Sequence, residues 1–69
     1  MKKIKIRLNG KVTKIDESSK MQNLVNKFKI PLKKVAIELN NEIINKKRLD
    51  KIKLKNKDKI EIVHFIGGG

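Results

Sequence analysis

The residues best suited to carry chemistry are the three glycines that end the chain, Gly67, Gly68 and Gly69. A carboxylate is a poor electrophile, but joining the Gly69 carboxylate to the α-phosphate of ATP gives an acyl-adenylate, which a sulfur nucleophile can attack. Glycine has no side chain to obstruct that carbonyl, and consecutive glycines let an extended segment enter a narrow channel. These residue types suit activation of the Gly69 carboxylate inside a partner's active site, with Gly67 and Gly68 as the segment that threads into it.

Other candidates for chemistry are weaker. His64 is the single histidine and the chain has no cysteine, so neither a disulfide framework nor a cysteine-based zinc site is available. Only Glu61 and Asp58 lie near His64 in sequence, and the acidic residues are scattered among lysines and asparagines, which does not favour paired-carboxylate catalysis. We expect no catalytic residue, no bound metal or cofactor and no intrinsic enzyme activity.

A short apolar segment precedes the glycines. In an extended strand, Val63 and Phe65 point to the face opposite Ile60 and Ile62. We expect Val63, Phe65 and Ile66 to form a patch that docks partner enzymes, with Phe65 as its anchor because aromatic residues often dominate interfaces. The alternative is ordinary surface hydrophobicity, since single exposed apolar residues are common.

The formal net charge of +12 raises a second class of function, the binding of nucleic acid. Lysines occur in nearly every segment and do not gather in one run, which favours a solvated surface with a compositional bias. Only two phenylalanines are present, too few for a platform that stacks bases, so a basic nucleic-acid-binding module remains an alternative with largely non-specific, salt-dependent binding.

Length limits the architecture to one small core, because a chain this short buries only about 60% of the surface that its unfolded form exposes. We expect a single domain over residues 1–69 with a flexible tail at 66–69. No apolar run approaches the roughly 20 residues needed to cross a bilayer. We expect a cytoplasmic protein that is monomeric in isolation and binds no membrane.

Alternating and helical patterns predict the elements that position the tail. Residues 2–8 alternate as a strand, Asn9-Gly10 is a hairpin turn, and a second strand covers about 11–15. Val12 keeps the alternation while Ile15 falls out of phase, which predicts a bend or bulge, or the end of pairing, near Lys14.

A helix is predicted to follow. Ser19 and Gln22 match a capping box, and Met21, Leu24, Val25 and Phe28 form one apolar stripe, expected to be core. Pro31 predicts that this helix ends at about Lys29.

The rest of the chain predicts a mixed sheet. A strand at 35–39, the Asn40-Asn41 turn, a short return strand at 43–44, an irregular crossing at 45–54 and a last strand at about 59–65 follow in order. This order suits an α+β fold of the β-grasp type, in which one helix packs across a sheet of four to five strands. The last strand then lies parallel to the first in the middle of the sheet, and the glycines project from its end.

The segments RLNGK, VAIELNNEII and IEIVHFIGGG resemble the ThiS family in order and spacing over nearly the whole chain. The resemblance implies a ubiquitin-like sulfur carrier of thiamine biosynthesis whose terminal diglycine, here Gly68 and Gly69, bears a thiocarboxylate. It also implies a ThiF-type adenylating enzyme that uses ATP, a cysteine desulfurase as the sulfur source, and a thiazole synthase of the ThiG type as the acceptor.

Two points keep alternatives open within that resemblance. Small subunits of molybdopterin synthase and other ubiquitin-like sulfur carriers share the fold and the tail, so they remain alternatives. The chain also has Asn41 and Lys57 where the family usually has glycine, and Leu49 where a bulky residue such as tryptophan is common. Lys57 should either bear backbone strain or use a different turn.

Overall fold

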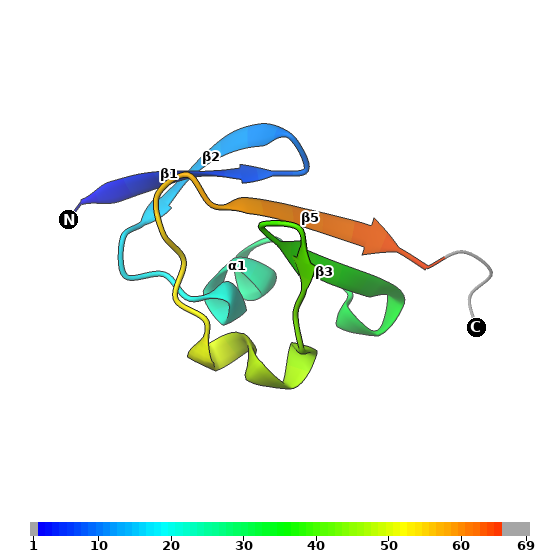
Figure 1. Ribbon diagram of the computed structural model, residues 1–69. Coiled ribbons are helices and arrows are strands. Elements are labelled where there is room, and N and C mark those ends of the chain that lie inside the picture. The colour runs from blue at the N-terminus through cyan, green and yellow to red at the C-terminus, as the bar shows by residue number, and fades with distance from the viewer. Residues whose placement is uncertain (1, 66–69) are drawn as a thin grey trace.

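The computed structural model describes residues 2–65. Within them, five strands form one sheet in the order β2-β1-β5-β3-β4. The elements are β1 (Lys3–Leu8), β2 (Lys11–Asp16), α1 (Met21–Lys27), the 3₁₀ turn η1 (Leu32–Lys34), β3 (Val35–Leu39), β4 (Glu42–Ile43), the 3₁₀ segment η2 (Lys46–Lys51) and β5 (Lys59–His64). Figure 1 shows α1 and η2 on one side of this sheet. The fold is the β-grasp that the sequence predicts.

The first hairpin turns where Asn9-Gly10 predicts, with φ of 50° at Asn9 and 82° at Gly10. The predicted bulge near Lys14 is wrong, because β1 and β2 pair in unbroken register from Lys3↔Asp16 to Leu8↔Lys11. Ile15 is buried opposite Ile4, whereas Val12 lies on the other face and is 62% exposed. The alternation is regular, but Ile15 and not Val12 marks its buried face.

The N-cap residue of α1 lies one residue later in the chain than predicted. Lys20 is the N-cap residue, and its backbone N–H donates to Asn23 Oδ1 at 2.8 Å, so the Ser19–Gln22 capping box is wrong. The Ser19 carbonyl instead accepts from the Leu54 backbone N–H at 2.9 Å, which ties the start of the helix to the crossing segment.

The helix also ends earlier than Lys29. Its last residue is Lys27, and Lys29 already has a positive φ of 52°. Phe28 therefore leaves the helical stripe and is 44% exposed, so its assignment to the core is wrong. The other three residues of the stripe are buried as predicted: Met21, Leu24 and Val25.

One apolar cluster fills the space between the sheet and the helical segments. Its buried members are Ile6, Ile15, Met21, Leu24, Val25, Val35, Ile37, Leu49, Leu54 and Ile60. The irregular crossing contributes Leu49 from η2 and Leu54 after it. The return strand β4 starts at Glu42, and Ile44 follows it with its backbone N–H donating to the Ile37 carbonyl at 2.9 Å.

None of the helices in residues 2–65 combines the length and the apolar character that crossing a membrane requires.

Candidate functional site

The strand that leads to the C-terminal glycines, β5, lies in the middle of the sheet. It pairs parallel with β1 at Lys59 and Ile60, and antiparallel with β3 from Ile60 to His64. Figure 1 shows β5 running past the end of the β1–β2 hairpin toward the C-terminus. The described chain thus places its last strand on a rigid support and directs its end outward.

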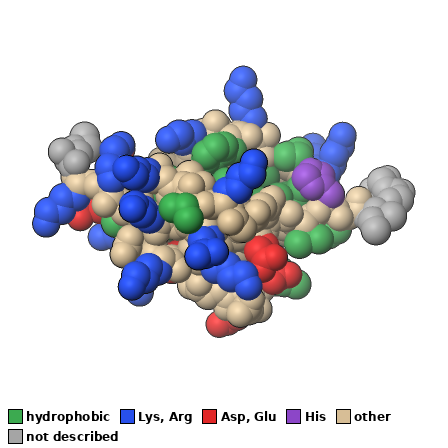
Figure 2. All heavy atoms as spheres, turned by 90° about the horizontal axis from the view of Figure 1, so that it is seen from above, with side chains coloured by type: hydrophobic (Ala, Val, Ile, Leu, Met, Phe, Trp, Pro, Cys, Tyr) green, Lys and Arg blue, Asp and Glu red, His purple; other side chains and the backbone are tan. Residues whose placement is uncertain are grey.

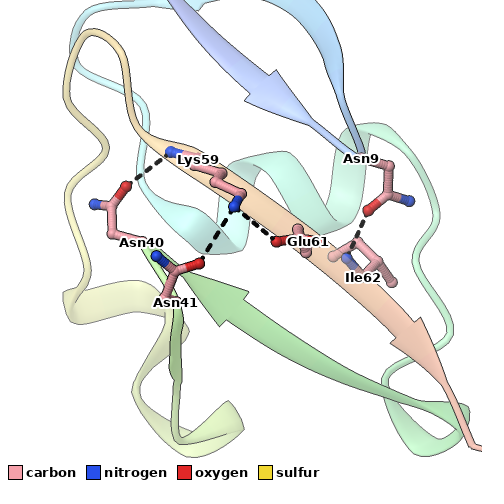
Figure 3. A network of polar contacts seen from close by, with 6 residues as sticks. All are labelled: Asn9, Asn40, Asn41, Lys59, Glu61 and Ile62. Atoms are coloured by element: carbon pink, nitrogen blue, oxygen red, sulfur yellow. Dashed lines mark hydrogen bonds and ion pairs between the residues drawn. The ribbon is translucent and has the colours of Figure 1, made fainter.

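Two asparagine side chains extend the hydrogen bonding of β5 beyond its strand partners (Figure 3). Asn9 Oδ1 accepts from the Ile62 backbone N–H at 2.7 Å, and Asn40 Oδ1 accepts from the Lys59 backbone N–H at 2.9 Å. Both asparagines sit in turns with positive φ, at 50° and 51°. Asparagine tolerates that region, and here its amide oxygen stands in for a carbonyl of the next strand residue. The two turns therefore fix the register of β5 from both sides.

Around Lys59, a looser polar group covers the surface of the same strand. Its ammonium lies 3.3 Å from Asn41 Oδ1 and 3.3 Å from a carboxylate oxygen of Glu61 (Figure 3). Both members of the ion pair are about half exposed, so it contributes little to stability.

The turn before β5 is built around a buried carboxylate. Asp58 is 8% exposed, and its oxygens accept from the Lys55 backbone N–H at 2.7 Å and from Asn40 Nδ2 at 3.0 Å. Lys57 adopts a positive φ of 73°, and its backbone N–H donates to the Lys5 carbonyl at 2.7 Å. Of the two outcomes expected for Lys57, the structure shows the strained one. Asn41, the other departure from glycine, has φ of 72°.

Two of the three residues of the predicted docking patch lie among the residues that the structure describes. Val63 is 46% exposed and Phe65 is 54% exposed, and Val63 pairs with half-buried Ala36 on β3. Ile66 and the three glycines, including Gly69, lie outside the described residues. The structure thus brings Val63, Phe65 and Ala36 together at the end of β5, while the roles proposed for the tail stay predictions.

Lys46 holds this end of the molecule in a way that the sequence did not indicate. Its ammonium donates to the Leu32 carbonyl at 2.6 Å and to the Val35 carbonyl at 2.7 Å, and it lies 5.3 Å from the centre of the Phe65 ring. The Phe65 backbone N–H donates to the Lys34 carbonyl at 2.9 Å. A cation at this distance attracts an aromatic ring. Nothing in sequence distinguishes Lys46 from the other lysines.

Charge does not single out a catalytic centre in residues 2–65. Figure 2 shows lysine and arginine side chains spread over the visible face, with hydrophobic side chains reaching the surface beside the C-terminal end. His64 is exposed on β5, opposite Val35 of β3. On β2, a hydrogen bond from Lys3 and its positive charge hold the pKa of Asp16 below its usual value. No group of three metal-ligating side chains occurs in the described part of the chain.

Comparison with known proteins gives consistent matches. The model of the ThiS family matches residues 6–69. The sulfur carrier protein ThiS of Bacillus subtilis (strain 168) is 42% identical over 93% of this chain and 98% of its own length. A thiazole synthase of Magnetococcus marinus is 33% identical over 96% of this chain, which corresponds to 20% of that enzyme. The crystal structure of a thiamine biosynthesis protein, ThiS, from Geobacter metallireducens superposes with a TM-score of 0.83 at 30% identity, covering 96% of this chain and all of the other.

Proposed function

Because the chain belongs to the ThiS family, we propose that it carries the sulfur used to build the thiazole moiety of thiamine. The C-terminal carboxylate of Gly69 is adenylated at the expense of ATP, converted to a thiocarboxylate, and donates its sulfur to thiazole synthase. Gly67 and Gly68 enter the active sites of the partners, and Val63, Phe65 and Ile66 dock against them.

The observation that carries this proposal is the support of β5. The strand is held by β1, β3 and the side chains of Asn9 and Asn40, yet its last described residues are exposed. The sequence then continues through Ile66 into the three glycines. A reactive terminus delivered to another protein needs a rigid body behind it, because a positioned group loses less entropy when it binds.

The relatives favour thiazole synthase as the sulfur acceptor. In the thiazole synthases of Magnetococcus marinus and Paramagnetospirillum magneticum, the stretch similar to this chain makes up 20% of a longer protein. A carrier domain and an acceptor in one chain meet at a high effective concentration, which is an advantage only if they act on each other. The same relatives favour the thiazole pathway over the synthesis of molybdopterin.

Activation is assigned to partners and not to this chain. A ThiF-type enzyme adenylates Gly69, and a cysteine desulfurase supplies the sulfur. The carrier contributes the carboxylate, the glycines that admit it to an active site, and the surface that docks. We therefore expect it to have no turnover alone.

The test is the intact mass of the protein after incubation with ATP, a ThiF-type enzyme, a cysteine desulfurase and cysteine. We expect a mass gain equal to the replacement of one oxygen by sulfur, confined to the C-terminal peptide. A chain that lacks Gly69 is the control and should show no gain, since its terminal carboxylate falls short of the active site. Loading of the shortened chain as efficiently as the full one, or no loading of either, would contradict the proposal.

A further inference from the structure

Within residues 2–65, the second half of β5 is paired with a strand on one edge only. Pairing with β1 stops at Leu8↔Ile60, because the chain then turns through Asn9 and Gly10, whereas pairing with β3 continues to Val35↔His64. Figure 3 shows the Asn9 side chain reaching the Ile62 backbone on this side of β5. The second half of β5 is thus an edge strand on the side of the hairpin.

Alternation along the strand identifies the backbone groups at that edge. The carbonyls of Asp58 and Ile60 and the N–H of Ile62 point toward the hairpin, where they bond Arg7, Asn9 and the Asn9 side chain. The carbonyl of Lys59 and the N–H of Phe65 point the other way, toward β3 and its neighbours. Successive residues alternate in direction, so the Ile62 carbonyl and the N–H of His64 face the hairpin side, beyond the reach of β1.

On the other side of the sheet, the edge of β3 that faces away from β5 is covered by a lysine side chain. Beyond the two-residue strand β4, the carbonyl of Val35 on β3 is taken by the Lys46 ammonium at 2.7 Å, which also bonds the Leu32 carbonyl. Proteins commonly cover an edge strand with a charged side chain to prevent unwanted pairing. Within residues 2–65, β5 has no such cover past Asn9, which leaves its backbone open to a partner.

The number of residues between Phe65 and Gly69 requires that any enzyme that binds Gly69 in its active site also lies against this edge of β5. Four residues follow Phe65, and four residues span at most about 14 Å when fully extended. An active site that holds the Gly69 carboxylate below its surface must therefore bring that surface against the end of β5. The open edge, Val63 and Phe65 all lie there.

From these observations, and resting on the proposed function, we infer that thiazole synthase adds an extended segment to β5 by bonding the Ile62 carbonyl and the His64 N–H. Addition of a strand gives affinity through main-chain hydrogen bonds and fixes direction as well as position. It aligns the tail with the acceptor's active site, while Phe65 and Val63 supply apolar contact on the adjoining face. The carrier thus docks by its backbone and not by its apolar patch alone.

A pair of substitutions at His64 separates the backbone from the side chain. His64→Pro removes the N–H at the open edge, and His64→Ala removes the ring but keeps that N–H. Proline is tolerated where the lost N–H belongs to an edge. We expect His64→Ala to bind thiazole synthase within about twofold of the unmodified protein, and His64→Pro to bind at least about tenfold more weakly, as the loss of one interfacial hydrogen bond predicts.

A chemically synthesised chain with an ester in place of the peptide bond between Val63 and His64 has an oxygen where the His64 N–H was. This variant tests the same N–H without introducing the ring of proline. Urea unfolding of all three variants shows whether each keeps its fold. If His64→Pro does not fold, the affinity of the ester variant alone tests the inference. Binding is measured by calorimetry on the carboxylate forms, so it does not depend on sulfur loading. Equal affinity of the ester and the unmodified protein would overturn the inference, as would the absence of any binding by the unmodified protein. Intact binding with no thiocarboxylate formation would overturn only the sulfur-carrying function.

Discussion

The two halves of β5 differ in how they are held. In the first half, Ile60 is fully buried and pairs with both β1 and β3, and the preceding Asp58 is buried with its oxygens hydrogen bonded. In the second half, Val63 is about half exposed, as is Phe65 directly after the strand, and among the described strands β3 alone pairs with this half. One strand therefore serves the core at its start and the surface at its end.

This difference separates stability from function along a single strand. Burial and hydrogen bonds at the start of β5 contribute to the free energy of unfolding, whereas exposed groups at its end contribute little until a partner covers them. Substitutions in the first half should change stability, and substitutions in the second half should change binding. The predictions below test that separation, beginning with the largest effect.

The largest effect is expected for Ile60→Ala. Ile60 has 0% exposure and lies in the apolar cluster beneath the sheet, so the shorter side chain leaves a cavity. Such truncations cost about 2 to 5 kcal/mol, and we expect about 3 kcal/mol at this central position. Urea unfolding measures the loss. Val63→Ala, on the outer face of the same strand, is the matched control and should change stability by less than about 0.5 kcal/mol. Similar losses in the two variants would break the comparison.

Asp58→Ala should have the next largest effect. The substitution removes the buried carboxylate that accepts from the Lys55 N–H and Asn40 Nδ2, both of which belong to exposed residues. A hydrogen bond to a charged group contributes roughly 1.5 to 3 kcal/mol, and water can reach the freed donors, so we expect about 2 kcal/mol in the free energy of unfolding. Asp58→Asn keeps one acceptor oxygen and should lose less. An Asp58→Asn variant as unstable as Asp58→Ala would show that the charge, and not the hydrogen bonding, is what the turn requires.

Phe65→Ala tests the second half of the strand. Phe65 is 54% exposed and its ring centre lies 5.3 Å from the Lys46 ammonium, so removal of the ring should leave stability within about 0.5 kcal/mol. Affinity for a ThiF-type enzyme or thiazole synthase should fall about tenfold, because aromatic anchors commonly dominate an interface. Phe28→Ala is the matched control, since Phe28 is also an exposed phenylalanine at 44% but follows α1 and not β5. Equal affinity of Phe65→Ala and Phe28→Ala would mean that the Phe65 ring is not an anchor of the interface.

The order of the elements and the position of β5 were predictable from local patterns. The Asn9-Gly10 turn, the helical stripe of Met21, Leu24 and Val25, and the alternation of the last strand each require only short-range rules. Joined in sequence, they indicate a β-grasp with β5 in the centre, and the structure confirms it.

Errors arose where distant contacts decide between local alternatives. Val12 and Ile15 both suit a strand, and only the packing beneath the sheet shows that Ile15 is the buried one. Ser19 matches a cap, but its carbonyl is engaged by Leu54, far along the chain, so the helix starts after Lys20. Phe28 continues the helical stripe, yet the backbone leaves the helix before it.

The residues of the candidate site could be proposed from the sequence, whereas the contacts that hold β5 in place could not. The pattern of Val63 and Phe65 indicated exposed apolar residues before the glycines, which the structure confirms as far as Phe65. The asparagine bonds to β5 join residues far apart in sequence, such as Asn9 and Ile62, and so does the bond from Lys46 to the Val35 carbonyl. Local patterns carry no information about such pairs.

The smallest expected effect is a gain in stability from Lys57→Gly. Lys57 has φ of 73°, where a side chain costs about 1 to 2 kcal/mol, whereas glycine is unstrained there. Glycine also raises the conformational entropy of the unfolded chain, which offsets about 0.5 to 1 kcal/mol of that relief. A net stabilisation of about 0.5 kcal/mol remains, and urea unfolding measures it. The comparison variant is Lys29→Gly, because Lys29 is a second lysine with positive φ, at 52°. Because Lys57 precedes the anchored start of β5, sulfur loading of Gly69 should be unchanged. A Lys57→Gly variant that is more stable but loads more slowly would show that strain at the start of β5 reaches its functional end, and would break the separation between the two halves.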